Sequence, residues 1–169
     1  EEGIRISDEA LEYVARMGDG SMRDAVSLLD QCASYDFQEE ISYEDALKVL
    51  GAVDTTVFSA LVQAILKKDI RAAMENISTV LEQGKELSQY TSDLLLYFRN
   101  MMLAKTVTKL EGLVDLSEDN KKLLSEDAKA MSMEEILRGI RLLSELLQQF
   151  RYANQKRVLL ETCLMKLAY

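Results

Sequence analysis

Apolar residues recur along this chain at intervals of three and four, the spacing of amphipathic α-helices, and this pattern predicts about nine helices. The first three are short and have expected ranges of about 7–17, 21–33 and 42–51. In the first of them Leu11, Val14 and Ala15 are expected to face inward. Because only short turns separate the three helices, we expect them to pack together as one small unit.

Two of these helices begin with a serine that is followed three residues later by an aspartate. Ser21 precedes Asp24, and Ser42 precedes Asp45. In a capping box the serine hydroxyl accepts a hydrogen bond from a free backbone amide, and the acidic side chain accepts one from the serine amide. The two pairs therefore predict helix starts at Ser21 and Ser42.

Beyond Gly51 the predicted helices become longer. One is lined by Phe58, Leu61, Val62, Ile65 and Leu66, and the next by Ile70, Ala73, Met74, Ile77, Val80 and Leu81, ending at Gly84. Further helices are expected over 87–107, 133–150 and 155–168, and the polar stretch 111–131 is expected to hold one or two short ones.

Two of the longer helices carry specific expectations about what they bury. The helix over 87–107 is apolar nearly all round, so we expect it either at the centre of a bundle or beneath a partner. The helix over 133–150 is expected to turn one apolar side inward, made of Ile136, Leu137, Ile140, Leu143 and Leu147.

The composition supports an entirely helical protein. The chain has no proline and only seven glycines, so little interrupts its helices. Apolar residues make up 48% and charged residues 29%, which is globular rather than disordered composition. No apolar run approaches the roughly 18 residues that would span a membrane, and the first residues do not resemble a signal peptide. We therefore expect a soluble, cytoplasmic protein.

Charge divides the chain near Gly51. Residues 1–50 hold four basic and thirteen acidic side chains, whereas residues 51–169 hold sixteen of each, so the net charge of −9 lies entirely in the first part. This change in net charge predicts two modules, 1–50 and 51–169. An acidic first module is not expected to bind nucleic acid, because that requires a basic face.

The side chains that are missing exclude several kinds of site. The chain contains no histidine and only two cysteines, Cys32 and Cys163, which lie far apart in apolar helical patterns. These cannot form a zinc site of about four ligands, and histidine-based catalysis is excluded. We expect both thiols to be buried and reduced. No GxxxxGK phosphate loop occurs, since Lys105 and Thr106 follow Ala104.

Arg23 is the one residue that suggests a binding site. It falls at the second position of its predicted helix, where the helix dipole favours acids and disfavours a cation by roughly 0.3–1 kcal/mol. Free backbone amides and an arginine fork at the same place suit a phosphate. The alternative is that Arg23 pairs with Asp19 or Asp24 and has no further role.

The stretch from Gly20 to Gln31 reads GSMRDAVSLLDQ and resembles the sensor-2 motif of AAA-plus clamp-loader ATPases. Within them it is most similar to the GSxRDAxSLLDQ form of the bacterial DNA polymerase III gamma/tau family. The segments 6–17, 94–105 and 157–167 are also similar to that family, so the resemblance covers essentially the whole chain. It implies an all-α fold, with a three-helix lid over 1–50 and a helical-bundle collar of five to six helices over 51–169.

The resemblance also implies roles. Arg23 would reach the γ-phosphate of ATP bound to an upstream ATPase domain, with Ser21 and Met22 near the phosphate. Asp24, Asp30 and Gln31 match the motif but are expected to serve capping and packing. ATP is the only cofactor expected, and no metal.

The collar would join delta, delta-prime and further gamma/tau copies into the ring that places a sliding clamp on primed DNA during replication. Contact of this chain with nucleic acid or membrane is not expected. The parent would be an ATPase subunit of the DNA-directed DNA polymerase holoenzyme. This chain would be its C-terminal piece, which by itself neither hydrolyses ATP nor binds it appreciably.

Two other interpretations compete with this one. The chain could be a generic all-α scaffold, or the lid region of another AAA-plus machine. The latter usually carries a winged-helix DNA-binding module, and this sequence shows neither a strand pair nor a basic recognition helix. An autonomous enzyme is the least favoured alternative.

Overall fold

The structure is a computed structural model that describes residues 3–169 except residue 19, 36–39, 51–54 and residues 109, 111 and 115, and omits the side chains of Arg16 and Glu44. The described residues form nine α-helices, and their only β-pairing is an isolated bridge between Ile6 and Ile41. The chain divides into two compact units, Glu1–Ala52 (unit 1) and Val53–Tyr169 (unit 2). The prediction of an all-α fold is confirmed.

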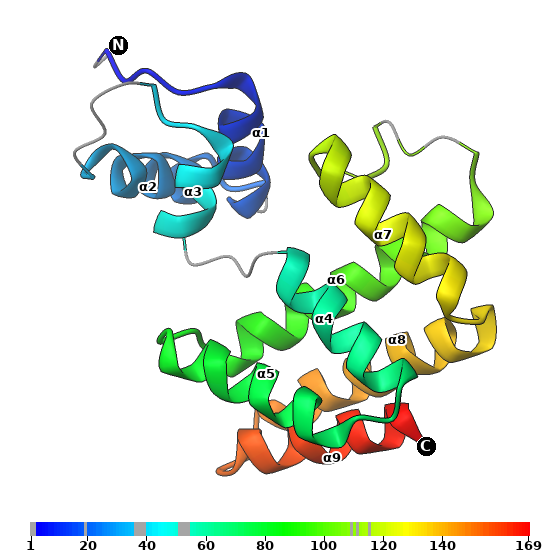
Figure 1. The fold of residues 1–169 in the computed structure, drawn as a ribbon. Helices are drawn as coiled ribbons and strands as arrows, with labels where there is room; N and C mark the ends of the chain where they lie inside the picture. The colour runs from blue at the N-terminus through cyan, green and yellow to red at the C-terminus, as the bar shows by residue number, and fades with distance from the viewer. Residues whose placement is uncertain are drawn as a thin grey trace. The chain divides into compact units, whose positions relative to one another are not determined.

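Unit 1 contains α1 (Asp8–Met17), α2 (Met22–Ala33) and α3 (Tyr43–Val49) (Figure 1). The three helices enclose a small core made of Ala10, Val14, Cys32, Ile41 and Ala46. The bridge ties the residues before α1 to those before α3, since the amide of Ser7 donates to the Ile41 carbonyl at 3.0 Å.

The apolar side of α1 is narrower than the sequence pattern predicts. Val14 is buried, but Leu11 is 44% exposed and Ala15 is also exposed, so the expectation for these two was wrong. Ala10, one turn before Val14, is fully buried instead. The reason is that unit 1 is small. Helix α1 packs against α2 and α3, and the small side chain of Ala10 allows these helices to approach it closely.

The two predicted capping boxes differ in the structure. At α3 both halves form, because the Asp45 amide donates to the Ser42 hydroxyl at 3.2 Å and the Ser42 amide donates to the Asp45 carboxylate at 3.2 Å. At α2 only the first half forms: the Asp24 amide donates to the Ser21 hydroxyl at 3.3 Å. Both serines cap their helices as expected.

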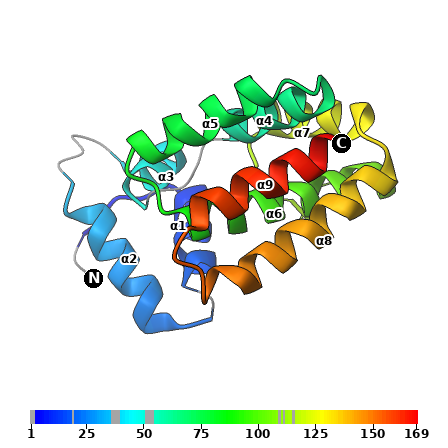
Figure 2. The ribbon, with the colours of Figure 1, turned by 90° about the horizontal axis from the view of Figure 1, so that it is seen from below.

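Unit 2 is a bundle of the six remaining helices: α4 (Thr55–Leu66), α5 (Ile70–Glu82), α6 (Leu87–Thr106), α7 (Glu118–Ala130), α8 (Met133–Phe150) and α9 (Lys156–Ala168). The apolar helix α6 packs against α8 along most of its length and also contacts α4, α7 and α9. Figure 2 shows α9 between the α4–α5 pair and α8, antiparallel to α8. Of the two expectations for α6, the central position in the bundle is therefore confirmed.

The inner side of α8 is shifted relative to the predicted one. Leu137 is 49% exposed, so its predicted inward position was wrong, and Leu146 is buried instead. Gly139 is also buried, and a Cβ atom there would overlap the ring of Phe98 on α6. This glycine lets α6 and α8 approach closely, and it lies in one buried stripe of α8 with Ile136, Leu143, Leu146 and Phe150.

The polar stretch before α8 contains one helix, α7, within the described residues. Cys32 and Cys163 are both buried and free, as predicted. No described helix is long and apolar enough to cross a membrane.

Candidate functional site

A tight glycine turn leads into the start of α2. Gly20 has φ +79°, a left-handed conformation that favours glycine, and the Ser21 amide donates to the Gly18 carbonyl at 2.8 Å. A Cβ atom on Gly18 would lie 2.7 Å from the Cβ of Ala25, so the turn packs tightly against α2. The glycine turn thus determines where α2 begins, so that Met22 is the first residue of the helix and Arg23 the second.

Arg23 is exposed at this helix start. Among the described residues, including Asp24, none forms an ion pair or hydrogen bond with its guanidinium. The alternative of a pair with Asp24 is therefore not observed, while Asp19 lies outside the described residues. The exposed guanidinium of Arg23 thus has no partner within the described part of unit 1.

Two large apolar side chains flank Arg23 on the outer side of α2. Met22 is 79% exposed and Val26, one turn later, is 47% exposed. Both are apolar residues at helical spacing, and the sequence gave no sign that they lie outward. A cation between exposed apolar side chains suits an interface better than a freely solvated surface.

Of the other motif residues, Gln31 connects two helices, while Asp24 and Asp30 take part in backbone hydrogen bonds at the ends of α2. The Gln31 side chain donates to the Val49 carbonyl at 3.4 Å and so ties α2 to α3. The Asp24 amide takes part in the Ser21 cap, and the Asp30 carbonyl accepts from the Ser34 hydroxyl at 2.7 Å. Of these three residues only Gln31 makes its contact through its side chain, so the capping and packing roles of the Asp24 and Asp30 side chains stay predictions.

Unit 2 contains a buried polar cluster that the sequence analysis did not identify. The carboxylate of Asp127, which is 1% exposed, accepts hydrogen bonds from the Gln63 amide and the Tyr97 hydroxyl, each at 2.7 Å. Burial, together with the neighbouring carboxylate, raises the pKa of Tyr97 far above its usual range, so its hydroxyl stays a donor. The cluster joins α4, α6 and α7, and its sequence signal is an acid at an apolar position of α7.

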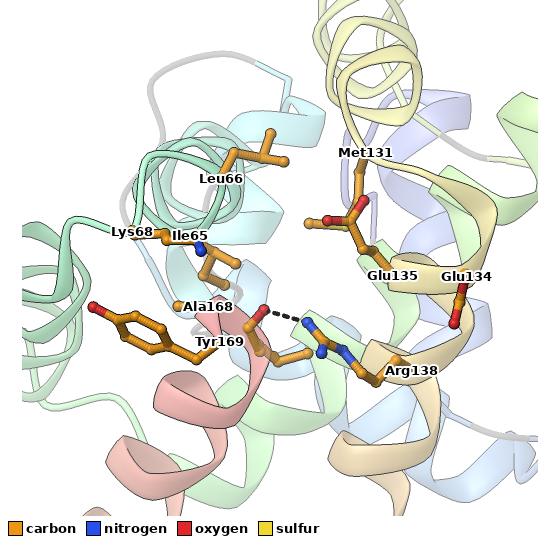
Figure 3. A pocket seen from close by; sticks show the side chains of 10 residues that line it. Ile65, Leu66, Lys68, Met131, Glu134, Glu135, Arg138, Ala168 and Tyr169 are labelled. Atoms are coloured by element: carbon orange, nitrogen blue, oxygen red, sulfur yellow. Dashed lines mark hydrogen bonds between the residues drawn. The ribbon is translucent and has the colours of Figure 1, made fainter.

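A cavity of about 280 Å³ lies where the ends of α4, α8 and α9 meet (Figure 3). Arg138 reaches across from α8 and donates to the Leu167 carbonyl at 2.8 Å, which caps the last turn of α9. Glu135 caps α8, where hydrogen bonds from Ser132 lower the pKa of its carboxyl. Lys68 also lines the cavity and lies 5.3 Å from the centre of the Tyr169 ring, and the buried Nε of Arg138 has no hydrogen-bond partner among the described residues.

The described residues hold no cluster of histidine, cysteine, aspartate or glutamate side chains that could bind a metal ion. Burial raises the pKa of the Cys163 thiol to about 11 and also raises that of Cys32. Neither thiol is therefore activated as a nucleophile. Arg23 at the start of α2 remains the feature of the described chain that best suits a ligand.

Two family models match consecutive parts of the chain, and the second part begins before α3 of unit 1. The family model described as "DNA polymerase III subunits gamma and tau domain III" matches residues 41–169. A second model, "DNA polymerase III clamp loader subunit, ATPase lid domain", matches residues 1–35. The lid match contains Arg23 and the whole of α2.

Individual relatives extend over nearly the whole chain. DNA polymerase III subunit tau of Bacillus subtilis is 32% identical over 168 residues, which are 98% of this chain and 29% of that protein. DNA polymerase III subunit gamma/tau of Mycobacterium tuberculosis is 29% identical over 99% of this chain and 29% of its own length. The chain therefore spans less than a third of these relatives.

The fold also resembles a solved structure, the DNA clamp loader delta protein of Bacillus subtilis. The TM-score is 0.59 over 99% of this chain and 52% of that one, at 20% sequence identity. At this identity the likeness concerns the fold alone.

Proposed function

This chain belongs to the family of DNA polymerase III gamma and tau subunits, and on that premise we propose that residues 1–50 are the lid of an AAA-plus clamp-loader ATPase and residues 51–169 its collar. The separate cores of the two units support this division. The step from an acidic to a neutral segment near Gly51 supports it as well.

Arg23 is the sensor of this lid. In the whole protein it contacts the γ-phosphate of ATP bound to the upstream ATPase domain, with Ser21 and Met22 at the helix start nearby. The observation that carries this proposal is an exposed guanidinium without a described partner at a helix start, inside a match to the lid model. Loss of the γ-phosphate removes this contact, so the lid's position depends on the nucleotide.

The collar assembles the loader ring. Unit 2 binds the corresponding regions of delta, delta-prime and further gamma/tau copies, and the ring places the sliding clamp on primed DNA. ATP is bound and hydrolysed only when the ATPase domain is present, because one arginine and a few amides cannot replace a phosphate loop. Within that holoenzyme the chain acts in the cytoplasm of a bacterium.

The proposal is tested with Arg23→Ala in the full-length protein, assembled with its partner subunits. We expect folding to be unchanged and clamp-stimulated ATP turnover to fall about ten- to a hundredfold. The reason is that a hydrogen bond to a charged group is worth about 1.5–3 kcal/mol, and each 1.36 kcal/mol changes a rate tenfold.

Arg5→Ala is the matched control, because Arg5 is also an exposed arginine of unit 1 but precedes α1. It should leave turnover unchanged. If Arg23→Ala kept wild-type turnover, Arg23 would have no part in sensing ATP.

A further inference from the structure

Helix α7 contributes little apolar area to the core of unit 2. It packs against α4 and α6 at the edge of the bundle (Figure 1). Leu124 and Ala128 are its only buried apolar residues, and Asp127 is the third residue that it buries. Helix α9 also has 13 residues and buries five of them, all apolar. Because burial of apolar area is the main force that holds a helix to a bundle, α7 is held weakly by this force.

Several interactions of α7 lie within the helix itself. The Ser117 hydroxyl accepts a hydrogen bond from the Asn120 amide at 3.3 Å and caps the first turn. Lys121 and Lys122 each pair with an acid three residues earlier, at 2.8 and 3.2 Å. Such local contacts stabilise the helix whether or not it touches its neighbours. They therefore do not hold α7 against α4 and α6.

The buried contact between α7 and its neighbours is largely polar. The Asp127 carboxylate accepts hydrogen bonds from Gln63 of α4 and Tyr97 of α6, and we call these three side chains the polar latch. Among the described residues, no lysine or arginine forms an ion pair with Asp127. A buried carboxylate gives up its hydration, and two hydrogen bonds from neutral groups mainly offset that loss. The polar latch therefore fixes the position of α7 while adding little net stability to its contact.

The chain on either side of α7 is anchored independently of it. Val114 before the helix is 4% exposed, and Met131 directly after it is 3% exposed. One further contact comes from Lys105 of α6, which donates to the Ala128 carbonyl at 2.7 Å. Because Lys105 is exposed, water replaces this contact at small cost when the helices separate. The helix can thus leave its neighbours while the core beyond both of its ends stays packed.

We propose that α7 separates from α4 and α6 as one unit while the other helices of unit 2 stay packed. The separated state exposes the polar latch and the sides of α4 and α6 that α7 covers. This conformational device depends on contacts within unit 2 alone, so it does not rest on the proposed collar function.

Native-state hydrogen exchange of the chain in increasing, sub-denaturing urea tests the inference. We expect the amides of α7 to have opening constants at least about a hundredfold larger than the buried amides of α6 and α8. Their exchange should depend only weakly on urea, because separation of one helix exposes little surface. If α7 shares the opening constants and the urea dependence of α6 and α8, it does not separate, and the inference is overturned.

Two conservative variants of α6 test whether the polar latch holds α7. Tyr97→Phe removes only the hydroxyl that donates to Asp127, and Tyr90→Phe removes the hydroxyl that donates to Asn76 of α5 at 2.9 Å. Both tyrosines are buried, so the two variants are matched. Tyr97→Phe should raise the opening constant of α7 about tenfold. Those of α6 and α8 should rise by the same factor, because the latch is absent from the separated and the unfolded states alike.

The Tyr90→Phe variant should raise the opening constants of α6 and α8 but leave that of α7 unchanged. The reason is that the contact between Tyr90 and Asn76 persists when α7 separates. Circular dichroism verifies that both variants fold. An equal rise for α7 and α8 in Tyr90→Phe, or no rise for α7 in Tyr97→Phe, would show that the polar latch does not hold a separately opening helix.

Discussion

Asp127 is a carboxylate that unit 2 buries almost completely. Its two oxygens accept hydrogen bonds from Gln63 on α4 and Tyr97 on α6, so one side chain of α7 connects three helices. Helix α7 buries only two other residues, Leu124 and Ala128. Its attachment therefore depends heavily on this carboxylate.

Replacing Asp127 by alanine should lower the free energy of unfolding by about 2–4 kcal/mol, because the buried Tyr97 hydroxyl and the half-buried Gln63 amide lose their acceptor. Urea denaturation followed by circular dichroism measures this. Asp119→Ala on the same helix is the control, since that side chain is 94% exposed and pairs only with Lys122, and it should change stability by less than about 0.5 kcal/mol. Equal effects of the two substitutions would show that the cluster contributes little.

For single residues, the sequence predicted the position of Arg23 in its helix but not which side chains surround it. A serine cap and a glycine turn are local signals, so the position of Arg23 in the helix could be predicted. Which apolar residues face outward depends on the neighbouring helices that a helix packs against, and a single sequence does not show which helices these are. This is why the exposure of Met22 and the burial of Asp127 emerged only from the structure.

Among the helices, the contact between α6 and α8 is the most extensive in unit 2. At its centre Gly139 lies against the ring of Phe98, with no room for a Cβ atom. The helix limits were predictable because caps and glycines are local, and α6 ends within one residue of its expected range. The exposure of Leu137 was not predictable, because the close contact at Gly139 outweighs the preference for burying the larger side chain.

Gly139→Ala therefore tests the packing of these two helices. In an open helix position this substitution stabilises by roughly 0.5–1 kcal/mol, but here we expect a loss of about 1–3 kcal/mol from overpacking. The opposite signs make thermal or urea unfolding decisive, with Gln148→Ala on the exposed side of α8 as the control. A stabilised Gly139→Ala protein would mean that α6 and α8 are farther apart than described.

The whole molecule combines two units with different properties. Unit 1 is small, acidic and presents Arg23 on its surface, while unit 2 is a neutral bundle with its own large core. The sequence predicted this contrast because the net charge of a segment is the sum over its residues, and because helix lengths follow from the local apolar pattern. The exposure of Val158 and Met165 on the outer side of α9 could not be predicted, since its inner and outer sides both follow helical spacing.

The central proposal is that residues 1–169 act as a lid and a collar and assemble into a clamp loader. The most direct measurement is DNA- and clamp-stimulated ATP turnover of the loader, assembled from full-length subunits with increasing amounts of this chain. We predict that turnover falls as the chain takes collar positions, and that complexes containing it can be isolated. Undiminished turnover at a large excess of the chain, with no chain in the complexes, would contradict the claim.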